Sequence, residues 1–280
     1  MKPIYETDNG QLFCFDNIKY LNTVNDNTFD LTVTSPPYDN LRDYKGYSWD
    51  FEALAKELYR TTKVGGVVVW VVGDATIEGS ETGSSFRQAL YFMECGFNLH
   101  DTMIYHKVSP FPSNVRYQQA FEYMFILSKG KPKTFNASLR QLKSAKPFSK
   151  NVESKTYRDK YGKTTNPNER AVLRLRNAQN EKYTIAENIW YIPAGYMIGS
   201  KDKCSFNHPA TFPENLAYYH VMSWSNKNDV IFDSFMGSGT TAKMCEKSNR
   251  KWIGCEISEE YCEIIKHRIE TEVNQLKLEF

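Results

Sequence analysis

The sequence predicts an α/β protein with a doubly wound, mostly parallel sheet. Three observations support this fold class. Apolar, β-branched runs alternate with segments of helical spacing along most of the chain. Residues 67–72 are apolar without interruption, which is typical of a strand buried on both faces. Near the C-terminal end, a glycine-rich turn at residues 237–239 stands between a predicted strand and a predicted helix.

The first half of the chain contains five predicted strands and three predicted helices. Asp16 is placed to cap the first, short helix, which ends near Leu21. Gly65 and Gly66 are expected to stop the second helix before the next strand begins. The second and third helices are expected at residues 51–63 and 84–94. The strands are expected at residues 11–15, 29–33, 67–72, 99–106 and 122–127.

The α/β pattern resumes after the apolar residues 189–193. Pro213 and Glu214 open a helix that continues to Met222. Ser258 is expected to cap the last helix of the chain. The remaining elements are a strand at 229–233, a helix that starts at 243–247 and a strand at 251–256.

Residues 130–187 break this pattern. Between Arg140 and Lys182 the sequence has twelve Lys and Arg against four Asp and Glu, with aromatic residues interleaved. This composition is the electrostatic footprint of nucleic-acid binding, and a solvated insertion is the alternative. We therefore predict a catalytic domain formed by residues 1–129 and 188–280, with a basic insertion at 130–187.

Composition excludes several classes of protein. The chain has 280 residues, 41% hydrophobic and 24% charged, as expected for a globular protein. No run approaches the roughly 18 apolar residues of a membrane span, and residues 1–6 lack the apolar segment of a secretory signal. The six cysteines are scattered without a Cys-x-x-Cys pair. We expect a cytoplasmic protein without disulfides or a metal site.

The chain is organised around residues 34–38, Thr-Ser-Pro-Pro-Tyr, directly after a predicted strand. Pro36 and Pro37 have no N–H to donate, so they end the strand in a stiff turn. The Ser35 hydroxyl and the Pro36 carbonyl are acceptors that would free the lone pair of an exocyclic base amine. Tyr38 is placed to stack on a base that has left its helix. The alternative is a strand-ending turn with a capping serine.

A second constellation points to an adenosine-containing cofactor. Gly237 and Gly239 allow the backbone to approach a ligand, and Glu256 ends the following strand, where it can accept ribose hydroxyls. The spacing to Ala242, with Glu256 fourteen residues further on, also fits a dinucleotide fingerprint, so a nicotinamide-dependent oxidoreductase is an alternative. Asp233, before the glycines, weighs against it, because a carboxylate there repels a pyrophosphate and attracts an ammonium group.

Residues 34–38 and 233–241 together resemble the amino-group DNA methyltransferases in the family's β arrangement, with the catalytic motif first. Residues 208–214 are similar to the segment that precedes the cofactor strand in that group. The resemblance implies S-adenosylmethionine as cofactor, a seven-stranded sheet, a flipped base and direct methyl transfer. It also implies that the basic insertion is the target-recognition region.

The motifs assign candidate roles residue by residue. The implied catalytic residues are Ser35, Pro36, Pro37 and Tyr38. The implied cofactor-binding residues are Asp16, Thr34, His208, Asp233, Phe235, Gly237, Gly239, Thr240 and Glu256. The chain departs from the family at Ser234, where proline is frequent, and at Phe15, where glycine is common before the residue that matches Asp16.

The expected substrate is double-stranded DNA. Cytosine C5 methylation uses a cysteine nucleophile, usually in Pro-Cys, and no Pro-Cys occurs here, so Ser35 is expected to orient an amine. Serine at the first motif position favours N4 of cytosine, with N6 of adenine as the alternative. A DNA-binding protein with a lapsed catalytic site is a third hypothesis. A cognate restriction endonuclease and a second copy of the chain are further candidate partners, and no membrane partner is expected.

Overall fold

The fold is described from a computed structural model. The structure describes residues 2–38, 49–107, 114–137, 140–142, 157–158, 163–165, 183–193, 195, 197–200, 202–208 and 210–273. The chain forms two compact units. The larger is Met1–Ser138 with Asn188–Phe280, and the smaller is Leu139–Glu187.

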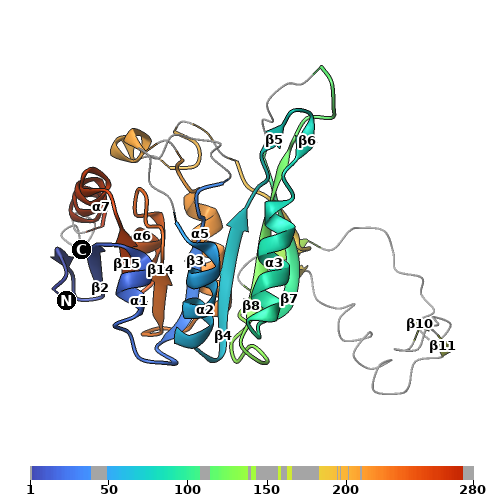
Figure 1. Cartoon of the computed structure of the whole chain (residues 1–280), viewed down its shortest axis with the longest axis horizontal. Coiled ribbons are helices and arrows are strands. Elements are labelled where there is room, and N and C mark those ends of the chain that lie inside the picture. Colours follow the sequence, from blue (N-terminus) through green and yellow to red (C-terminus); the bar gives the residue numbers. More distant parts are fainter. Residues whose placement is uncertain are drawn as a thin grey trace. The chain divides into compact units, whose positions relative to one another are not determined.

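The larger unit contains one sheet that runs through its centre (Figure 1). Across the sheet lie β1 (Tyr5–Glu6), β2 (Gly10–Cys14), β15 (Lys251–Glu256), β14 (Val230–Asp233), β3 (Phe29–Thr34), β4 (Thr62–Val72), β8 (Phe121–Ser128), β7 (Asn98–His106) and β13 (Ile189–Tyr191). β1 and β8 run antiparallel to their neighbours, and the other pairs are parallel. In this spatial order, the seven strands that begin with β2 and end with β7 are the expected ones. The short strands β1 and β13 extend the sheet at its two edges.

Helices cover both faces of the sheet (Figure 1), which confirms the doubly wound fold. On one face lie α1 (Asn17–Leu21), α2 (Phe51–Thr61) and α3 (Ser84–Glu94). On the other lie α5 (Glu214–Trp224), α6 (Thr240–Lys247) and α7 (Glu259–Glu272). The 3₁₀ helix η2 (Lys203–Asn207) packs against α7, and β5 (Thr76–Ile77) and β6 (Ser80–Glu81) form a small hairpin after β4.

Connections leave β14 and β3 in opposite directions. The chain passes from β14 through α6 to β15, and from β3 through α2 to β4 on the other side. Because β14 and β3 are neighbouring parallel strands, a crevice is expected between the loops that follow them. We call the side of the sheet where these parallel strands end the carboxyl edge.

The interior of the sheet is strongly apolar. Every residue of β3 is buried, and the rings of Phe29 and Phe232 stack across β3 and β14 with centroids 4.5 Å apart. Trp70 and Phe92 are fully buried between β4 and α3. Since burying one large apolar side chain contributes roughly 1.5–3 kcal/mol, these central strands form a rigid base for the loops at the carboxyl edge.

Two predicted boundaries were wrong. β4 begins at Thr62, before the two glycines that were expected to separate helix from strand. Gly65, with φ +81°, and Gly66 lie inside β4, where the pairing register with β3 shifts, so the glycines accommodate a bulge. The helix predicted to start near Lys243 begins three residues earlier, at Thr240, because Gly239 is its N-terminal cap.

The smaller unit contains two short antiparallel pairs among its described residues. β9 (Arg140–Leu142) pairs with β12 (Tyr183–Ile185), and β10 (Tyr157–Arg158) pairs with β11 (Thr164–Thr165). Most of the basic side chains on which the nucleic-acid prediction rests lie outside the described residues, and so does the polar loop at 39–48.

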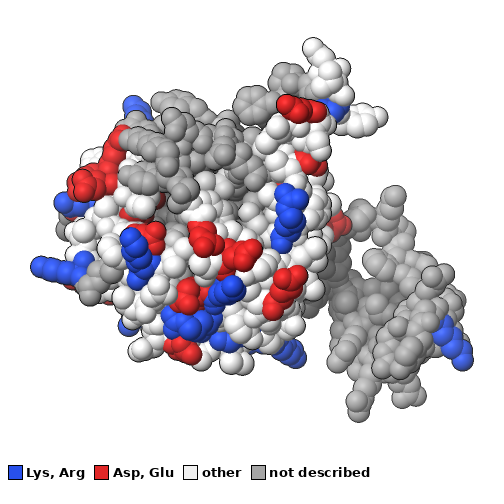
Figure 2. All heavy atoms as spheres, in the orientation of Figure 1, with Lys and Arg blue, Asp and Glu red and all other residues white. Residues whose placement is uncertain are grey.

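Charges on the face that carries α1, α2 and α3 are mixed (Figure 2). Arg60, for example, pairs with both Asp26 and Glu57 at 2.6 Å. Because the described acidic and basic side chains alternate in this way, they give no large field of one sign on this face. Among the described helices, none is both long and apolar enough to cross a bilayer.

Candidate active site

The two predicted motifs meet at the carboxyl edge, after the neighbouring strands β3 and β14. The Thr34 hydroxyl donates a hydrogen bond of 2.7 Å to Oδ1 of Asp233. The Ser234 hydroxyl in turn donates to Thr34 at 3.3 Å, so serine at this position links the two turns. Thr34 and Asp233 are 199 positions apart in sequence, and the parallel pairing of β3 with β14 brings them together.

Ser35, Pro36, Pro37 and Tyr38 leave the sheet directly after Thr34. The Ser35 hydroxyl and the Tyr38 hydroxyl lie 2.7 Å apart, and the Tyr38 hydroxyl donates to Oε2 of Glu122 at 3.2 Å. The Tyr38 ring is half-buried beside Gly73, the residue after β4. The turn therefore presents a serine whose hydroxyl is held by the tyrosine three residues later.

Glu122 was not expected at this site. It lies there because β8 is antiparallel to β4: Tyr123 pairs with Val72, so Glu122 stands at the carboxyl edge. Its Oε1 forms an ion pair with Lys107, which follows β7. The sequence predicted this strand but gave no sign of its direction.

The glycine turn after β14 is held by Glu256. Gly237 and Gly239 have backbone φ values of +51° and +80°, which residues other than glycine rarely adopt. The Gly237 N–H donates to Oε2 of Glu256 at 2.8 Å, and the Ser258 N–H donates to Oε1 at 3.0 Å. Burial raises the pKa of Glu256, although these hydrogen bonds oppose the shift. The acid at the end of β15 thus lies directly beside the glycine turn.

Asp233 lies beneath the turn and is only 5% exposed. Besides the Thr34 hydroxyl, its Oδ1 accepts the Phe235 N–H at 3.0 Å. Burial raises the pKa of Asp233, and hydrogen bonds from Thr34, Thr241 and Phe235 oppose the shift. This carboxylate therefore shapes the turn from below, and its expected interaction with a cofactor amine stays a prediction.

Three further predicted residues lie in or near the turns at the carboxyl edge. The ring of His208 lies about 3.1 Å from the position that a Cβ on Gly237 would occupy, and packs on Tyr261 at 4.4 Å between centroids. Phe235 packs on Trp49 at 5.1 Å. Asp16 caps α1 at the end of β2, where it accepts the Lys19 N–H at 2.8 Å.

The comparisons with known proteins identify the family. A family model described as a DNA methylase of the N6/N4 methyltransferase type matches residues 29–267. The chain belongs to this family. The enzyme is a DNA amino-methyltransferase, and its cofactor is S-adenosylmethionine.

Similar proteins include the orphan methyltransferase M.BamHII of Bacillus amyloliquefaciens, 56% identical over 88% of this chain and 90% of that protein. The type II methyltransferase M.PvuII of Proteus hauseri is 26% identical over 93% of this chain and 83% of its own. The structure of the PvuII DNA methyltransferase (cytosine-N4-specific) has a TM-score of 0.70 and 21% identity, covering 98% of this chain and 93% of that one. The structure of a putative DNA modification methylase from Thermus thermophilus, complexed with S-adenosyl-L-methionine, has a TM-score of 0.62 and 23% identity. The match covers 94% of this chain and 93% of that chain.

The residues at the carboxyl edge of this methyltransferase fit the cofactor. Each oxygen of Glu256 accepts a backbone N–H and keeps a lone pair for a ribose hydroxyl. Gly237 and Gly239 carry no side chain that would fill the space above the turn. Glu256, the glycine turn and the Ser-Pro-Pro-Tyr turn lie at the ends of β15, β14 and β3, which are consecutive across the sheet.

A buried ionic cluster supports the glycine turn of the methyltransferase from behind, and sequence patterns did not reveal it. We define the cluster as Asp202, Glu214, Lys243 and Arg268. Oδ2 of Asp202 accepts from both cations at 2.5 Å, and Oε1 of Glu214 accepts from both at 2.8 Å.

Arg268 connects this cluster to the turn. Its guanidinium donates to the Ser238 carbonyl and to the Thr240 hydroxyl, both at 2.9 Å. Burial alone would raise the pKa of Asp202, but hydrogen bonds from Lys243 and Arg268 hold it below the ordinary value. The predicted site residue Thr240 is therefore fixed by a cation from α7 and faces the interior.

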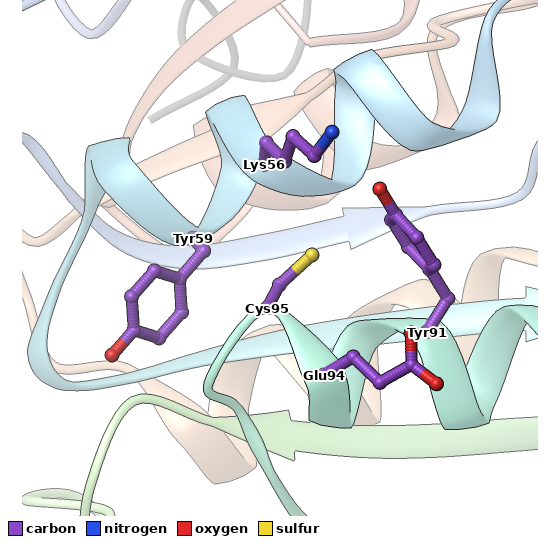
Figure 3. A pocket seen from close by; sticks show the side chains of 5 residues that line it. All are labelled: Lys56, Tyr59, Tyr91, Glu94 and Cys95. Carbon is purple, nitrogen blue, oxygen red and sulfur yellow. The ribbon is translucent and has the colours of Figure 1, made fainter.

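An open hollow between α2 and α3 is a separate feature (Figure 3). Figure 3 shows Lys56 and Tyr59 on α2 opposite Tyr91, Glu94 and Cys95 at the end of α3. Burial raises the pKa of the Cys95 thiol, which disfavours a reactive thiolate. The described residues that line this hollow include none of the predicted site residues.

Proposed function

We propose that the protein is a site-specific DNA methyltransferase that methylates the exocyclic N4 amine of cytosine in duplex DNA, on a base flipped out of the helix. One observation carries the proposal. The Thr34–Asp233 hydrogen bond of 2.7 Å joins the Ser-Pro-Pro-Tyr turn to the cofactor turn, so an amine held by Ser35 would lie next to the cofactor site.

The choice of cytosine N4 rests on two supports. Serine at position 35, in place of a carboxylate or an amide, favours a cytosine amine. The PvuII methyltransferase, whose fold is similar, is described as cytosine-N4-specific. The N6 amine of adenine is the second candidate, because the same hydroxyl can accept from either amine.

The catalytic turn would act by orienting the amine. The Ser35 oxygen and the Pro36 carbonyl would accept the two N–H groups, which draws the nitrogen toward tetrahedral geometry and frees its lone pair. Pro37 would keep the turn stiff, and the Tyr38 ring would stack on the flipped base. S-adenosylmethionine supplies the methyl group when it is bound.

The cofactor would be held by residues around the glycine turn. Glu256 would accept the ribose hydroxyls, and the negative charge of Asp233 would attract the cofactor's ammonium group. The remaining proposed cofactor residues are Asp16, Thr34, His208, Phe235, Gly237, Gly239 and Thr240, which lie in or around the turns that follow β2, β3 and β14.

Target recognition is assigned to the insertion at 130–187, on the basis of its charge. The domain of residues 1–129 and 188–280 would carry out the chemistry. The 56% identical relative is named an orphan methyltransferase, which gives no support to a cognate restriction endonuclease. A homodimer stays a proposal that sedimentation would test.

The function is tested with purified protein, duplex DNA of varied sequence and methyl-labelled S-adenosylmethionine. After digestion to nucleosides, the label should be found in N4-methylcytosine. Label in N6-methyladenine would overturn the choice of base and keep the class of enzyme. DNA without label, at a protein concentration that binds it, would contradict the proposed activity.

A further inference from the structure

We propose that Glu122 receives the proton that the substrate amine loses on methylation, through a hydrogen-bonded chain of Ser35 and Tyr38. The inference rests on the proposed function, and it adds a destination for the proton. Neither the motif nor the spacing of residues in the sequence pointed to Glu122.

The chemistry requires such a destination. Methyl transfer forms an N–C bond as an S–C bond of the cofactor breaks, and it leaves the amine nitrogen with a positive charge. The nitrogen then carries one proton more than the neutral methylated product. A flipped base is enclosed by protein, so a group of the chain is better placed than bulk water to take this proton.

The hydrogen bonds at the site form a continuous path. The Tyr38 hydroxyl donates its only proton to Oε2 of Glu122 at 3.2 Å. The 2.7 Å contact between the Ser35 and Tyr38 hydroxyls is then donated by Ser35. The Ser35 oxygen can therefore use its lone pairs to accept from the substrate amine that is proposed to bind there.

Each proton that leaves a group along this path is accepted by the next group. One amine proton passes to Oγ of Ser35 while the proton of Ser35 passes to Oη of Tyr38 and that of Tyr38 passes to Oε2 of Glu122. The product amine becomes neutral, both hydroxyls regain a proton, and the glutamate ends protonated. No other reactant is needed, and the serine never becomes a nucleophile.

The surroundings of Glu122 suit an acceptor that must be reset. Its other oxygen is paired with Lys107, and this ion pair fixes the position of the carboxylate beside Tyr38. The Glu122 side chain is 16% exposed and that of Lys107 is 33% exposed. Because the Glu122 side chain is partly exposed, solvent can remove the proton after the reaction.

Glu122→Gln is the main test, because glutamine keeps the shape and a carbonyl acceptor for Tyr38 but cannot take a proton. At saturating cofactor and DNA, kcat should fall by roughly 100-fold or more, the scale of general-base effects. The KM for DNA and the affinities for S-adenosylmethionine and for DNA, measured by calorimetry and anisotropy, should stay within about threefold of wild type.

Tyr38→Phe is the second test, because it keeps the ring and removes the hydroxyl that connects Ser35 to Glu122. It should lower kcat to a similar extent, and the double variant should be no slower than the slower single variant, since both break one path. The matched controls are Glu52→Gln and Tyr91→Phe. They make the same two changes in a Tyr-to-Glu hydrogen bond of the same 3.2 Å length between α2 and α3, and should leave kcat unchanged.

Chemical rescue of a Glu122 variant distinguishes a role in proton transfer from a structural role. Added formate should restore part of the kcat of Glu122→Ala, and chloride at the same ionic strength should not. A Glu122→Gln enzyme with kcat within about threefold of an active wild type would overturn the relay and leave the proposed function intact. A slow Glu122→Gln enzyme with weakened cofactor or DNA binding, and an alanine variant that formate fails to rescue, would also overturn it. A wild-type protein that methylates no DNA would contradict both.

Discussion

At the scale of single residues, Glu256 is an acidic side chain in a mostly buried position. It is 9% exposed, and burial raises its pKa, yet two backbone N–H groups orient both of its oxygens. A carboxyl group that is costly to bury and yet well oriented is expected to bind a ligand. The ribose hydroxyls of the cofactor are the donors that such an acceptor would bind.

Glu256→Ala is expected to weaken S-adenosylmethionine binding by roughly 10- to 100-fold, because hydrogen bonds to charged groups contribute about 1.5–3 kcal/mol. Isothermal titration calorimetry measures the effect. The control is Glu259→Ala, an exposed acid in the first turn of α7, which should bind as tightly as wild type. Equal affinity of Glu256→Ala and wild type would show that Glu256 does not hold the ribose.

The residues of the turns could be predicted from the sequence, but the residues that support the turns could not. Thr34, Asp233 and Glu256 could be predicted, because each ends an apolar strand and lies beside a recognisable turn. Glu122 could not, because its position depends on β8 running antiparallel, and strand direction leaves no mark on a single apolar run.

At the scale of elements, the buried ionic cluster joins η2, α5, α6 and α7 behind the glycine turn. The side chains of Asp202 and Arg268 are 2% and 0% exposed. Buried ion pairs contribute little net stability, but removal of one partner leaves an uncompensated charge. The cluster therefore fixes how α7 lies against the turn. No sequence pattern indicated it, because its four members come from four separate elements.

Asp202→Asn is expected to lower the free energy of unfolding by about 3–5 kcal/mol at pH 7, because Lys243 and Arg268 then share one anion. Urea denaturation measures the change. The control is Glu263→Gln, which removes an exposed partner of Lys266 at 3.9 Å and should change the free energy by less than about 1 kcal/mol. A small effect of Asp202→Asn would mean that the cluster does not hold α7.

The pH dependence of this difference follows from the lowered pKa of Asp202. A depressed folded pKa stabilises the protein fully above the unfolded value of about 3.9, and this stabilisation is lost as pH falls through the folded pKa. The stability gap between wild type and Asp202→Asn should therefore be constant from pH 7 to about 5 and shrink below about 4. A gap that grows on acidification would contradict the assigned shift.

At the scale of the whole molecule, chemistry and DNA recognition are assigned to different parts of the chain. The larger unit of 1–138 and 188–280 contains the sheet and both turns, and the smaller unit of 139–187 coincides with most of the basic insertion. The doubly wound sheet was predictable from its alternating pattern. The structure of the insertion was not, because it shows no period of two or 3.6 residues.

Replacement of four lysines in the insertion by alanine should weaken DNA binding and reduce its salt dependence. The four are Lys143, Lys146, Lys155 and Lys160. Each lost phosphate contact should flatten the slope of log K against log salt by about 0.9. Fluorescence anisotropy at several salt concentrations measures the slope.

The control replaces four exposed lysines of the larger unit, Lys2, Lys19, Lys247 and Lys251. It removes the same charge and should leave the slope close to that of wild type. An unchanged slope in the insertion variant would mean that DNA binds elsewhere.

Ser35 is proposed to direct methylation of a cytosine amine beside the cofactor turn. The most direct test of this role is nucleoside mass spectrometry of DNA from cells that express the wild-type protein or the Ser35→Ala variant. We expect N4-methylcytosine in the DNA from cells with the wild-type protein and none in the DNA from cells with Ser35→Ala, with equal cofactor binding by both purified proteins. N4-methylcytosine at equal levels in both would contradict the role of Ser35, and DNA with neither N4-methylcytosine nor N6-methyladenine would contradict the proposed activity.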